Sequence, residues 1–229
     1  MKKQLVTRMI YSFFGPPGSG KGTLAQKLAT SDNYQMLSTG NLCRQHVAQG
    51  TAFGKMLDEY IQQGHLIPDA LVTDMVIDWI THQANSKTPI ILDGFPRTKG
   101  QAELFLAFIQ QATGIQFVIV TFDVSDDEIV RRLSQRVVCS NKSCQASFTL
   151  SDNISVCTFC TSGLTTREDD REHVIRERLR QYPLYAGELL EHYKAVNQHL
   201  LILDIAGLSP EAVYQQFLMM AKSEHNGNH

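Results

Sequence analysis

The chain has 229 residues, of which 43% are hydrophobic, and its 21 basic and 23 acidic side chains give a formal charge of −2. Such a length buries a full core as one domain with insertions or as two small domains. The near-neutral charge excludes a general attraction to nucleic acid or anionic lipid, so a site for a polyanion must be built locally from clustered arginines. No apolar run approaches the roughly eighteen residues of a spanning helix, and the N-terminus shows no signal-peptide cleavage site. We therefore expect a soluble cytoplasmic protein that binds neither membranes nor nucleic acid.

Short apolar runs bounded by turn residues alternate with helical patterns along the chain. The runs, which are typical of buried parallel strands, are residues 9–14, 35–37, 90–92, 117–122 and 201–203. The predicted helices are residues 23–29, 42–48, 56–62, 71–82, 101–112, 128–137 and 169–196, and we expect Pro183 and Gly187 to break or bend the last of them. The alternation predicts an α/β fold with a five-stranded parallel sheet flanked by helices. Such sheets bind ligands beyond the carboxyl ends of their strands.

Two segments depart from this rhythm. Residues 39–67 hold two predicted helices where one crossover would suffice, so we interpret them as a small helical insertion over the edge of the sheet. Residues 136–170, here called the cysteine segment, are rich in Ser, Thr, Cys and Asn and lack helical periodicity, which is typical of a short β-rich flap. The core domain is then expected to comprise residues 1–38, 68–135 and 171–229.

The sequence GPPGSGKGT, from Gly15 to Thr23, lies between the first predicted strand and the first predicted helix. A glycine-rich turn in this position directs several main-chain N–H groups and the positive end of the helix at one point, which suits a polyphosphate. Lys21 adds a mobile positive charge for the outer phosphates. Gly22 stands where the strict pattern has Ser or Thr, with Thr23 one place later. We interpret this turn as a phosphate-binding loop; the alternative is an ordinary glycine turn.

Two further motifs follow predicted strands. DGFPRT starts at Asp93, where a carboxylate can hold magnesium through water, and its Arg97 can bind a second phosphate through two parallel hydrogen bonds. STGNLCR combines a strand end, a helix cap at Ser38 or Thr39 and a helix that presents Arg44. Each motif also has a plain interpretation, as a turn or a capped helix with a solvated arginine.

Arginines are concentrated on both sides of the cysteine segment. On the predicted helix 128–137, Arg132 and Arg136 are four residues apart and share a face. For most of the group we expect solvated faces and pairing with nearby acidic residues. Transfer of a phosphoryl group nevertheless requires several cations around the developing charge, and arginine supplies them. The arginines concerned are Arg131, Arg132, Arg136, Arg167, Arg171, Arg176, Arg178 and Arg180.

Four of the five cysteines, Cys139, Cys144, Cys157 and Cys160, lie within 22 residues. The CxxC pair presents two thiolates to one tetrahedral ion, and four thiolates favour zinc in a closed structural site. The first pair has the looser spacing CxxxxC. We predict structural zinc here, with a metal-free or partly ligated hairpin as the alternative. Cys43, far from this cluster, is expected to be a buried small hydrophobic residue.

Taken together, GPPGSGKGT, STGNLCR, DGFPRT, RRLSQR and TTREDD followed by VIRERL resemble the adenylate kinases of the long-lid bacterial type, from about Met9 to Pro210. The resemblance implies a P-loop kinase in which residues 39–67 bind AMP and the cysteine segment is a lid that carries zinc. It also implies reversible transfer of the terminal phosphoryl group of Mg-ATP to AMP, which gives two ADP and maintains adenine nucleotide balance. A monomer is expected on the same ground.

The resemblance assigns roles to individual residues. The transferring phosphoryl group would be handled by Lys21, Arg97, Arg132, Arg136, Arg167 and Arg178, with magnesium held through water at Asp93. ATP would be bound by Gly18, Ser19, Gly20, Lys21, Gly22, Thr23, Arg132, Arg136, Ser147, Phe148, Gly207 and Ser209. AMP would be bound by Thr39, Arg44, His65, Leu66, Ile67, Gly94, Phe95, Pro96, Arg97, Gln101, Arg167 and Arg178.

The sequence departs from the family pattern in three places. Asn41 replaces the aspartate usual after STG, and Val137 replaces a second arginine usual after Arg136, so those two family roles do not carry over. The longer first cysteine spacing makes Cys144 the least secure metal ligand. None of these departures touches the residues expected to transfer the phosphoryl group.

Three other functions remain open from the sequence. A kinase for UMP, CMP or GMP would share these motifs, because the choice of base depends on a few contacts; Gln101 and the long cysteine segment favour AMP. A zinc-ribbon protein that binds nucleic acid is disfavoured by the near-neutral charge and the lack of a basic surface studded with aromatic residues. A switch-type NTPase would consume ATP steadily without AMP.

Overall fold

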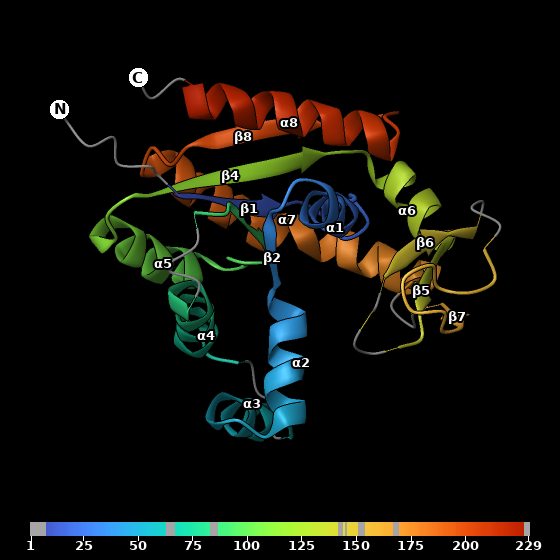
Figure 1. Cartoon of the computed structure of the whole chain (residues 1–229), viewed down its shortest axis with the longest axis horizontal. Coiled ribbons are helices and arrows are strands. Elements are labelled where there is room, and N and C mark those ends of the chain that lie inside the picture. The colour runs from blue at the N-terminus through green and yellow to red at the C-terminus, as the bar shows by residue number, and fades with distance from the viewer. Residues whose placement is uncertain are drawn as a thin grey trace.

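The computed structural model describes residues 8–62, 67–82, 87–141, 144, 146–150, 154–166 and 170–226. Its main sheet has five parallel strands in the order β2-β3-β1-β4-β8 (Figure 1). The strands are β1 (Arg8–Phe14), β2 (Gln35–Ser38), β3 (Ile90–Asp93), β4 (Ile115–Asp123) and β8 (Leu200–Asp204). All five predicted strands of the sheet are confirmed.

Helices cover both faces of this sheet. The helices are α1 (Lys21–Ser31), α4 (Asp69–His82), α5 (Lys99–Gln111), α7 (Glu172–Ala195) and α8 (Pro210–Asn226). Every residue of β1 is buried, and successive side chains point to opposite faces. Met9 and Tyr11 belong to the apolar cluster that includes α1 and α8, whereas Ile10 and Phe14 belong to the cluster that includes α4, α5 and α7. The predicted α/β fold with a doubly covered sheet is confirmed.

The strand register brings the three sequence motifs to one edge of the sheet. Asp93 at the end of β3 is in register with Phe13 on β1 and with Ser38 on β2. The glycine loop, DGFPRT and STGNLCR therefore all leave the sheet at its carboxyl edge, where ligands bind in folds of this kind.

The helical insertion consists of α2 (Thr39–Gln49) and α3 (Ala52–Gln62), which lie side by side below the main sheet in Figure 1. Gly50 ends α2 in the left-handed region, with a φ of 61°, and lets the chain reverse. Leu42 and Leu57 are buried and join the pair to the core. The division of the chain into core, insertion and lid stays a prediction.

The cysteine segment contains a second, antiparallel sheet in the order β6-β5-β7. Its strands are β5 (Arg136–Cys139), β6 (Ser147–Thr149) and β7 (Leu164–Thr165). The predicted helix 128–137 is too long, because α6 (Asp126–Ser134) ends before Arg136. Two β-branched residues, Val137 and Val138, pair with β6 instead of continuing the helix. The prediction that Arg132 and Arg136 share a helix face is therefore wrong.

The last two helices also differ from the predictions. α7 is a continuous helix of 24 residues that contains Pro183, so the predicted break at Pro183 or Gly187 is wrong, while a bend there stays a prediction. Packing of one buried face outweighs the lost main-chain hydrogen bond; that face carries Ile175, Leu179, Ala186, Leu189 and Tyr193. The sequence analysis did not identify α8. In the part of the chain that the structure describes, no helix is both long and apolar enough to span a bilayer.

Candidate active site

At two positions, the glycine loop between β1 and α1 has a left-handed backbone that favours glycine. Gly18 and Gly20 have φ values of 81° and 88°, and a Cβ on Gly18 would lie 2.7 Å from Cγ of Leu133. Any side chain at residue 18 would therefore be both strained and in collision with α6. Gly20 caps the start of α1, where the free N–H groups of the first turn face the loop.

Lys21 lies folded against this loop. Its Nζ donates hydrogen bonds to the carbonyl oxygens of Gly15 and Pro16, both at 2.7 Å, and to Oγ of Ser19 at 3.0 Å. Ser19 is fully buried under the loop. The ammonium group is therefore held against carbonyl oxygens of the loop, close to the start of α1, whose free N–H groups suit an anion.

Several charged side chains lie close enough to Lys21 to shift its pKa. Burial lowers the pKa of Lys21 to about 8, an effect that the Asp93 carboxylate opposes. The positive charges of Arg97, Arg178 and Arg136 lower the Lys21 pKa further. Residues from motifs far apart in the sequence thus form one cationic group beside the Asp93 carboxylate, with Asp170 paired to Arg136, and this arrangement suits a phosphate chain with a metal ion.

These residues line a cleft of about 720 Å³ between the glycine loop and the cysteine segment. Asp93 and Thr23 both line this cleft, and oxygen donors of this kind suit magnesium. The predicted site residues along the cleft are Gly18, Gly20, Lys21, Gly22, Thr23, Asp93, Arg97, Arg136, Ser147, Phe148 and Arg178. The sequence motifs therefore do converge on one cavity.

A hydrogen-bond network fixes the turn after β3. Oγ1 of Thr39 donates to the carbonyl oxygen of Gly94 at 2.9 Å, so this hydroxyl does not cap α2. Nε of Arg97 donates to the same carbonyl at 2.8 Å, and the main-chain N–H of Arg97 donates to Oε1 of Gln101. Phe95 is buried in the core with its ring 5.2 Å from that of Phe105. Its side chain therefore supports the turn and does not reach the cleft.

Five of the arginines around the cysteine segment pair with acidic side chains, which the sequence analysis expected for most of the group. Arg136 forms a two-pronged ion pair with Asp170, at 2.8 and 2.5 Å, across the cysteine segment. Arg132 donates to Glu128 at 2.8 Å and to the carbonyl of Ile205 at 3.4 Å. Hydrogen bonds from Arg131 and Arg132 lower the pKa of Glu128 to about 2. Exposed ion pairs to nearby acids hold Arg131, Arg176 and Arg180, which confirms their assignment to solvated faces.

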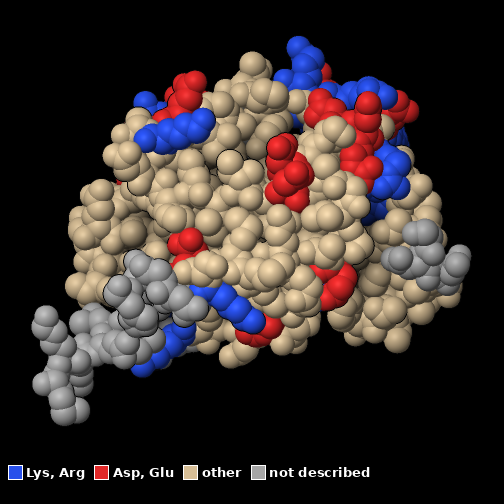
Figure 2. Space-filling view, turned by 90° about the horizontal axis from the view of Figure 1, so that it is seen from above, with Lys and Arg blue, Asp and Glu red and all other residues tan. Residues whose placement is uncertain are grey.

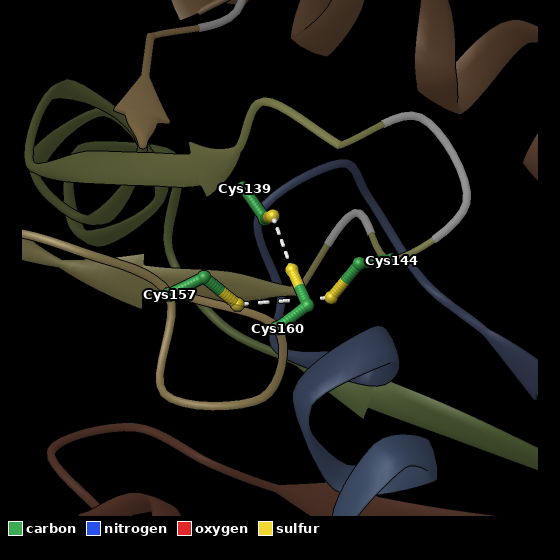
Figure 3. A group of neighbouring side chains, drawn as sticks. All are labelled: Cys139, Cys144, Cys157 and Cys160. Carbon is green, nitrogen blue, oxygen red and sulfur yellow. Dashed lines mark hydrogen bonds between the residues drawn. The ribbon is translucent and has the colours of Figure 1, made fainter. Parts of the chain in front are cut away.

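The four clustered cysteines point toward one another, as Figure 3 shows. Sγ of Cys139 lies 3.3 Å from Sγ of Cys160, and Sγ of Cys144 lies 3.7 Å from Sγ of Cys157. All four sulfurs are within 4.8 Å of one another. Zinc with tetrahedral bonds of about 2.3 Å requires sulfurs about 3.8 Å apart, so the donor set fits a structural zinc, Cys144 included. Cys43 is only half-buried but packs against the main core.

The other described residues that were predicted to bind nucleotide are not among those that line the cleft: Ser19, Thr39, Ile67, Gly94, Phe95, Pro96, Gln101, Arg132, Gly207 and Ser209. Ile67 packs against the main core, and Gly207 and Ser209 lie in the loop between β8 and α8, outside the residues that line the cleft. His65, Leu66, Arg167 and the side chain of Arg44 fall outside the described residues.

Phe159 is one of several cleft residues that the sequence analysis did not predict. Its side chain is 62% exposed, and its ring centroid lies 6.2 Å from that of Phe148. The sequence does indicate that this ring is exposed. Phe159 lies between Cys157 and Cys160, in a turn that is too short to bury an aromatic side chain.

The parallel sheet, the glycine loop and the surrounding cations define a P-loop enzyme that transfers phosphoryl groups. The pattern of the adenylate kinase family matches residues 13–198. The chain is 37% identical to an adenylate kinase of Methanocella arvoryzae over 203 residues, which are 87% of this chain and 91% of that protein. It is 35% identical to an adenylate kinase of Chlamydia abortus over 92% of this chain and 96% of that one. A third relative, from Thermosipho africanus, is 36% identical over 81% and 87%.

The chain therefore belongs to the adenylate kinase family. It is a nucleoside monophosphate kinase, and the reaction of the family is transfer of the terminal phosphoryl group of Mg-ATP to AMP to give two ADP.

Proposed function

We propose that the chain carries out this reaction in the cleft between the glycine loop and the cysteine segment. The observation that carries the proposal is the group of cations around Lys21, formed by Arg97, Arg136 and Arg178 beside Asp93. Phosphoryl transfer requires in-line positioning and matching of spread negative charge rather than covalent chemistry by the protein. Lys21 and Arg97 act on the transferring group, and Asp93 would hold magnesium through water, where the ion would neutralise charge on the phosphates.

ATP is assigned to the glycine-loop side of the cleft. Main-chain N–H groups of the loop bind its phosphates, together with Arg132, which lies beside Gly20 of the loop, and Arg136 from the cysteine segment. The rings of Phe148 and Phe159 form an apolar wall on the cysteine segment against which the base can pack. The proposed ATP residues are Gly18, Ser19, Gly20, Lys21, Gly22, Thr23, Arg132, Arg136, Ser147, Phe148, Gly207 and Ser209, together with Phe159.

AMP is assigned to the side of the helical insertion. The turn after β3 and the start of α2 face each other there through the Thr39–Gly94 hydrogen bond. Arg97 and Arg44 hold the AMP phosphate, and Gln101 contacts the base. The proposed AMP residues are Thr39, Arg44, His65, Leu66, Ile67, Gly94, Pro96, Arg97, Gln101, Arg167 and Arg178; Phe95 is left out because its side chain is buried in the core.

The cysteine segment is proposed to act as a lid. ATP in an open site would lose its phosphoryl group to water, whereas a lid that brings Arg136 and Arg167 to the phosphates only with both substrates bound admits the oxygen of AMP instead. Zinc on Cys139, Cys144, Cys157 and Cys160 keeps this small sheet rigid as it moves.

A coupled assay tests the proposal and its rivals together. ATP is incubated with AMP, GMP, CMP or UMP, and ADP formation is followed. We expect rapid ADP formation with AMP, slow formation with the other three and none with ATP alone. Preference for another monophosphate would identify a kinase for that base, and steady ATP consumption without AMP would identify a switch-type NTPase.

We further propose a cytoplasmic monomer that binds neither nucleic acid nor membranes. The face of the molecule in Figure 2 supports this, because Lys and Arg are interspersed with Asp and Glu and form no continuous basic area there. A gel shift with nucleic acid at low salt is expected to show no complex, and gel filtration is expected to give the mass of one chain, 25.7 kDa.

A further inference from the structure

The side chain of Gln101, in the first turn of α5, has a forced orientation. Gln101 is only 7% exposed, and both ends of its amide have a partner. Oε1 accepts the main-chain N–H of Arg97 at 2.8 Å, and Nε2 donates to Oδ1 of Asp69 at 2.9 Å. A main-chain N–H only donates and an ionised carboxylate only accepts, so rotation of the amide by 180° would oppose two donors at one end and two acceptors at the other.

The carboxylate of Asp69 is closely held in this position. Asp69 begins α4, where a negative charge is favoured by the helix dipole. Its carboxylate lies against the backbone of α5, because a Cβ on Gly100 would be 2.5 Å from Oδ2. The main chain of Gln101 is fixed as well, since its N–H donates to Oγ1 of Thr98 at 3.1 Å. The contact between Asp69 and Gln101 therefore joins the starts of two helices rather than two mobile side chains.

The amide keeps some hydrogen-bonding capacity for a ligand. A primary amide has two N–H donors and two oxygen lone pairs, and Asp69 and Arg97 use one of each. One lone pair of Oε1 and one N–H of Nε2 remain, each on a fixed side. Adenine carries an amino group, which donates, where guanine carries a carbonyl oxygen, which accepts. An amide of fixed orientation thus distinguishes the two bases, whereas a freely rotating amide fits both.

We propose that Asp69 is a positioning residue that sets base specificity: it fixes the orientation of the Gln101 amide so that the monophosphate site accepts adenine and rejects guanine. This inference rests on the proposed function, in which Gln101 contacts the AMP base. Asp69 itself need not touch the nucleotide. Its effect is on the ratio of kcat/KM for AMP to kcat/KM for GMP, because the same amide meets both bases.

Asp69→Asn tests the inference, because an asparagine amide pairs with either orientation of Gln101. We expect the AMP to GMP ratio of kcat/KM to fall about tenfold, with the KM for ATP unchanged, since one of the two opposing contacts is relieved. Asp74→Asn is the matched control: Asp74 is exposed on the same helix, and its substitution should leave the ratio unchanged. A folded Asp69→Asn protein with the wild-type ratio, or with equal losses for AMP and GMP, would overturn the inference.

Gly100→Ala provides a second route that leaves the chemistry of Asp69 intact. The added methyl group displaces the carboxylate, and we expect the ratio to fall in the same direction. If Asp69→Asn does not fold, the Gly100→Ala ratio decides the question alone. Failure of the proposed function would appear differently, as a wild-type protein that forms no ADP from ATP and AMP.

Discussion

The glycine loop and the cysteine segment form opposite walls of one cleft but are built by different means. The loop is shaped by main-chain geometry on a fully buried strand, with Gly18 pressed against Leu133. The cysteine segment has a small sheet, and among its described residues the buried hydrophobic side chains are those of Val137, Val138, Cys139 and Cys157. Half of that small core consists of thiols, so its stability depends on what the thiols bind.

Because the two walls are built differently, we expect them to be damaged by different changes. A wall made by the backbone of the main fold should tolerate loss of metal and fail when its glycines or its lysine change. A wall held by four thiols should tolerate glycine substitution and fail when a thiol is lost. We therefore expect a different type of substitution to disrupt each wall.

The largest effect is expected from Lys21→Met. Without the ammonium group the loop cannot neutralise the transferring phosphate, so kcat should fall by about a hundredfold to a thousandfold. The fold should survive, because the hydrogen bonds of Lys21 are made to the loop itself. Lys194→Met, an exposed lysine in the last turn of α7, is the control and should retain full activity. A Lys21→Met protein with near-normal ADP formation would refute the assignment.

A large effect on stability is expected from Cys157→Ser in the other wall. Loss of one of four thiolates should abolish zinc binding and lower the melting temperature on the order of 5 °C, while kcat falls less than tenfold. Cys43→Ser, outside the cluster, serves as control. Metal analysis and thermal unfolding measure both quantities. Identical melting curves and no zinc in the wild-type protein would remove the metal from the account.

A smaller effect is expected when one glycine from each wall is replaced by alanine and the two losses of stability are compared. Gly18→Ala should lower the free energy of unfolding by about 1–3 kcal/mol and raise the KM for ATP, because the left-handed backbone and the contact with Leu133 both oppose a methyl group. Gly163→Ala should change stability by less than about 0.5 kcal/mol, since the nearest atom to its added Cβ is 3.9 Å away. Urea titration separates the two. Equal losses would mean that the walls do not differ as described.

The sequence predicted the glycine-loop wall well because its information is local. GPPGSGKGT and DGFPRT each follow a buried strand, and parallel register alone brings Lys21 and Asp93 together. The cysteine cluster was also predicted, since ligand spacing is a short-range property. The β-rich character of residues 136–170 was predicted, but the end of the preceding helix was placed too late because its acidic and basic pattern runs into Val137, and only pairing with β6 shows where β5 begins.

Features that depend on tertiary contacts were not predicted. The continuity of α7 through Pro183 results from packing of its buried face on the core, which local propensity opposes. The ion pair of Arg136 with Asp170 joins residues 34 positions apart, and Phe159 enters the cleft only because the cysteine turn carries it there. The chemistry of single motifs could therefore be predicted from the sequence, whereas contacts between distant elements could not.

Calorimetry with a compound that joins two adenosines through five phosphates tests the central claim most directly. The account predicts one molecule bound per chain, at least about tenfold more tightly than ATP or AMP alone, because both halves of one cleft are filled at once. No detectable binding, or an affinity no better than that of ATP, would contradict the claim that cations from both walls hold two nucleotides end to end.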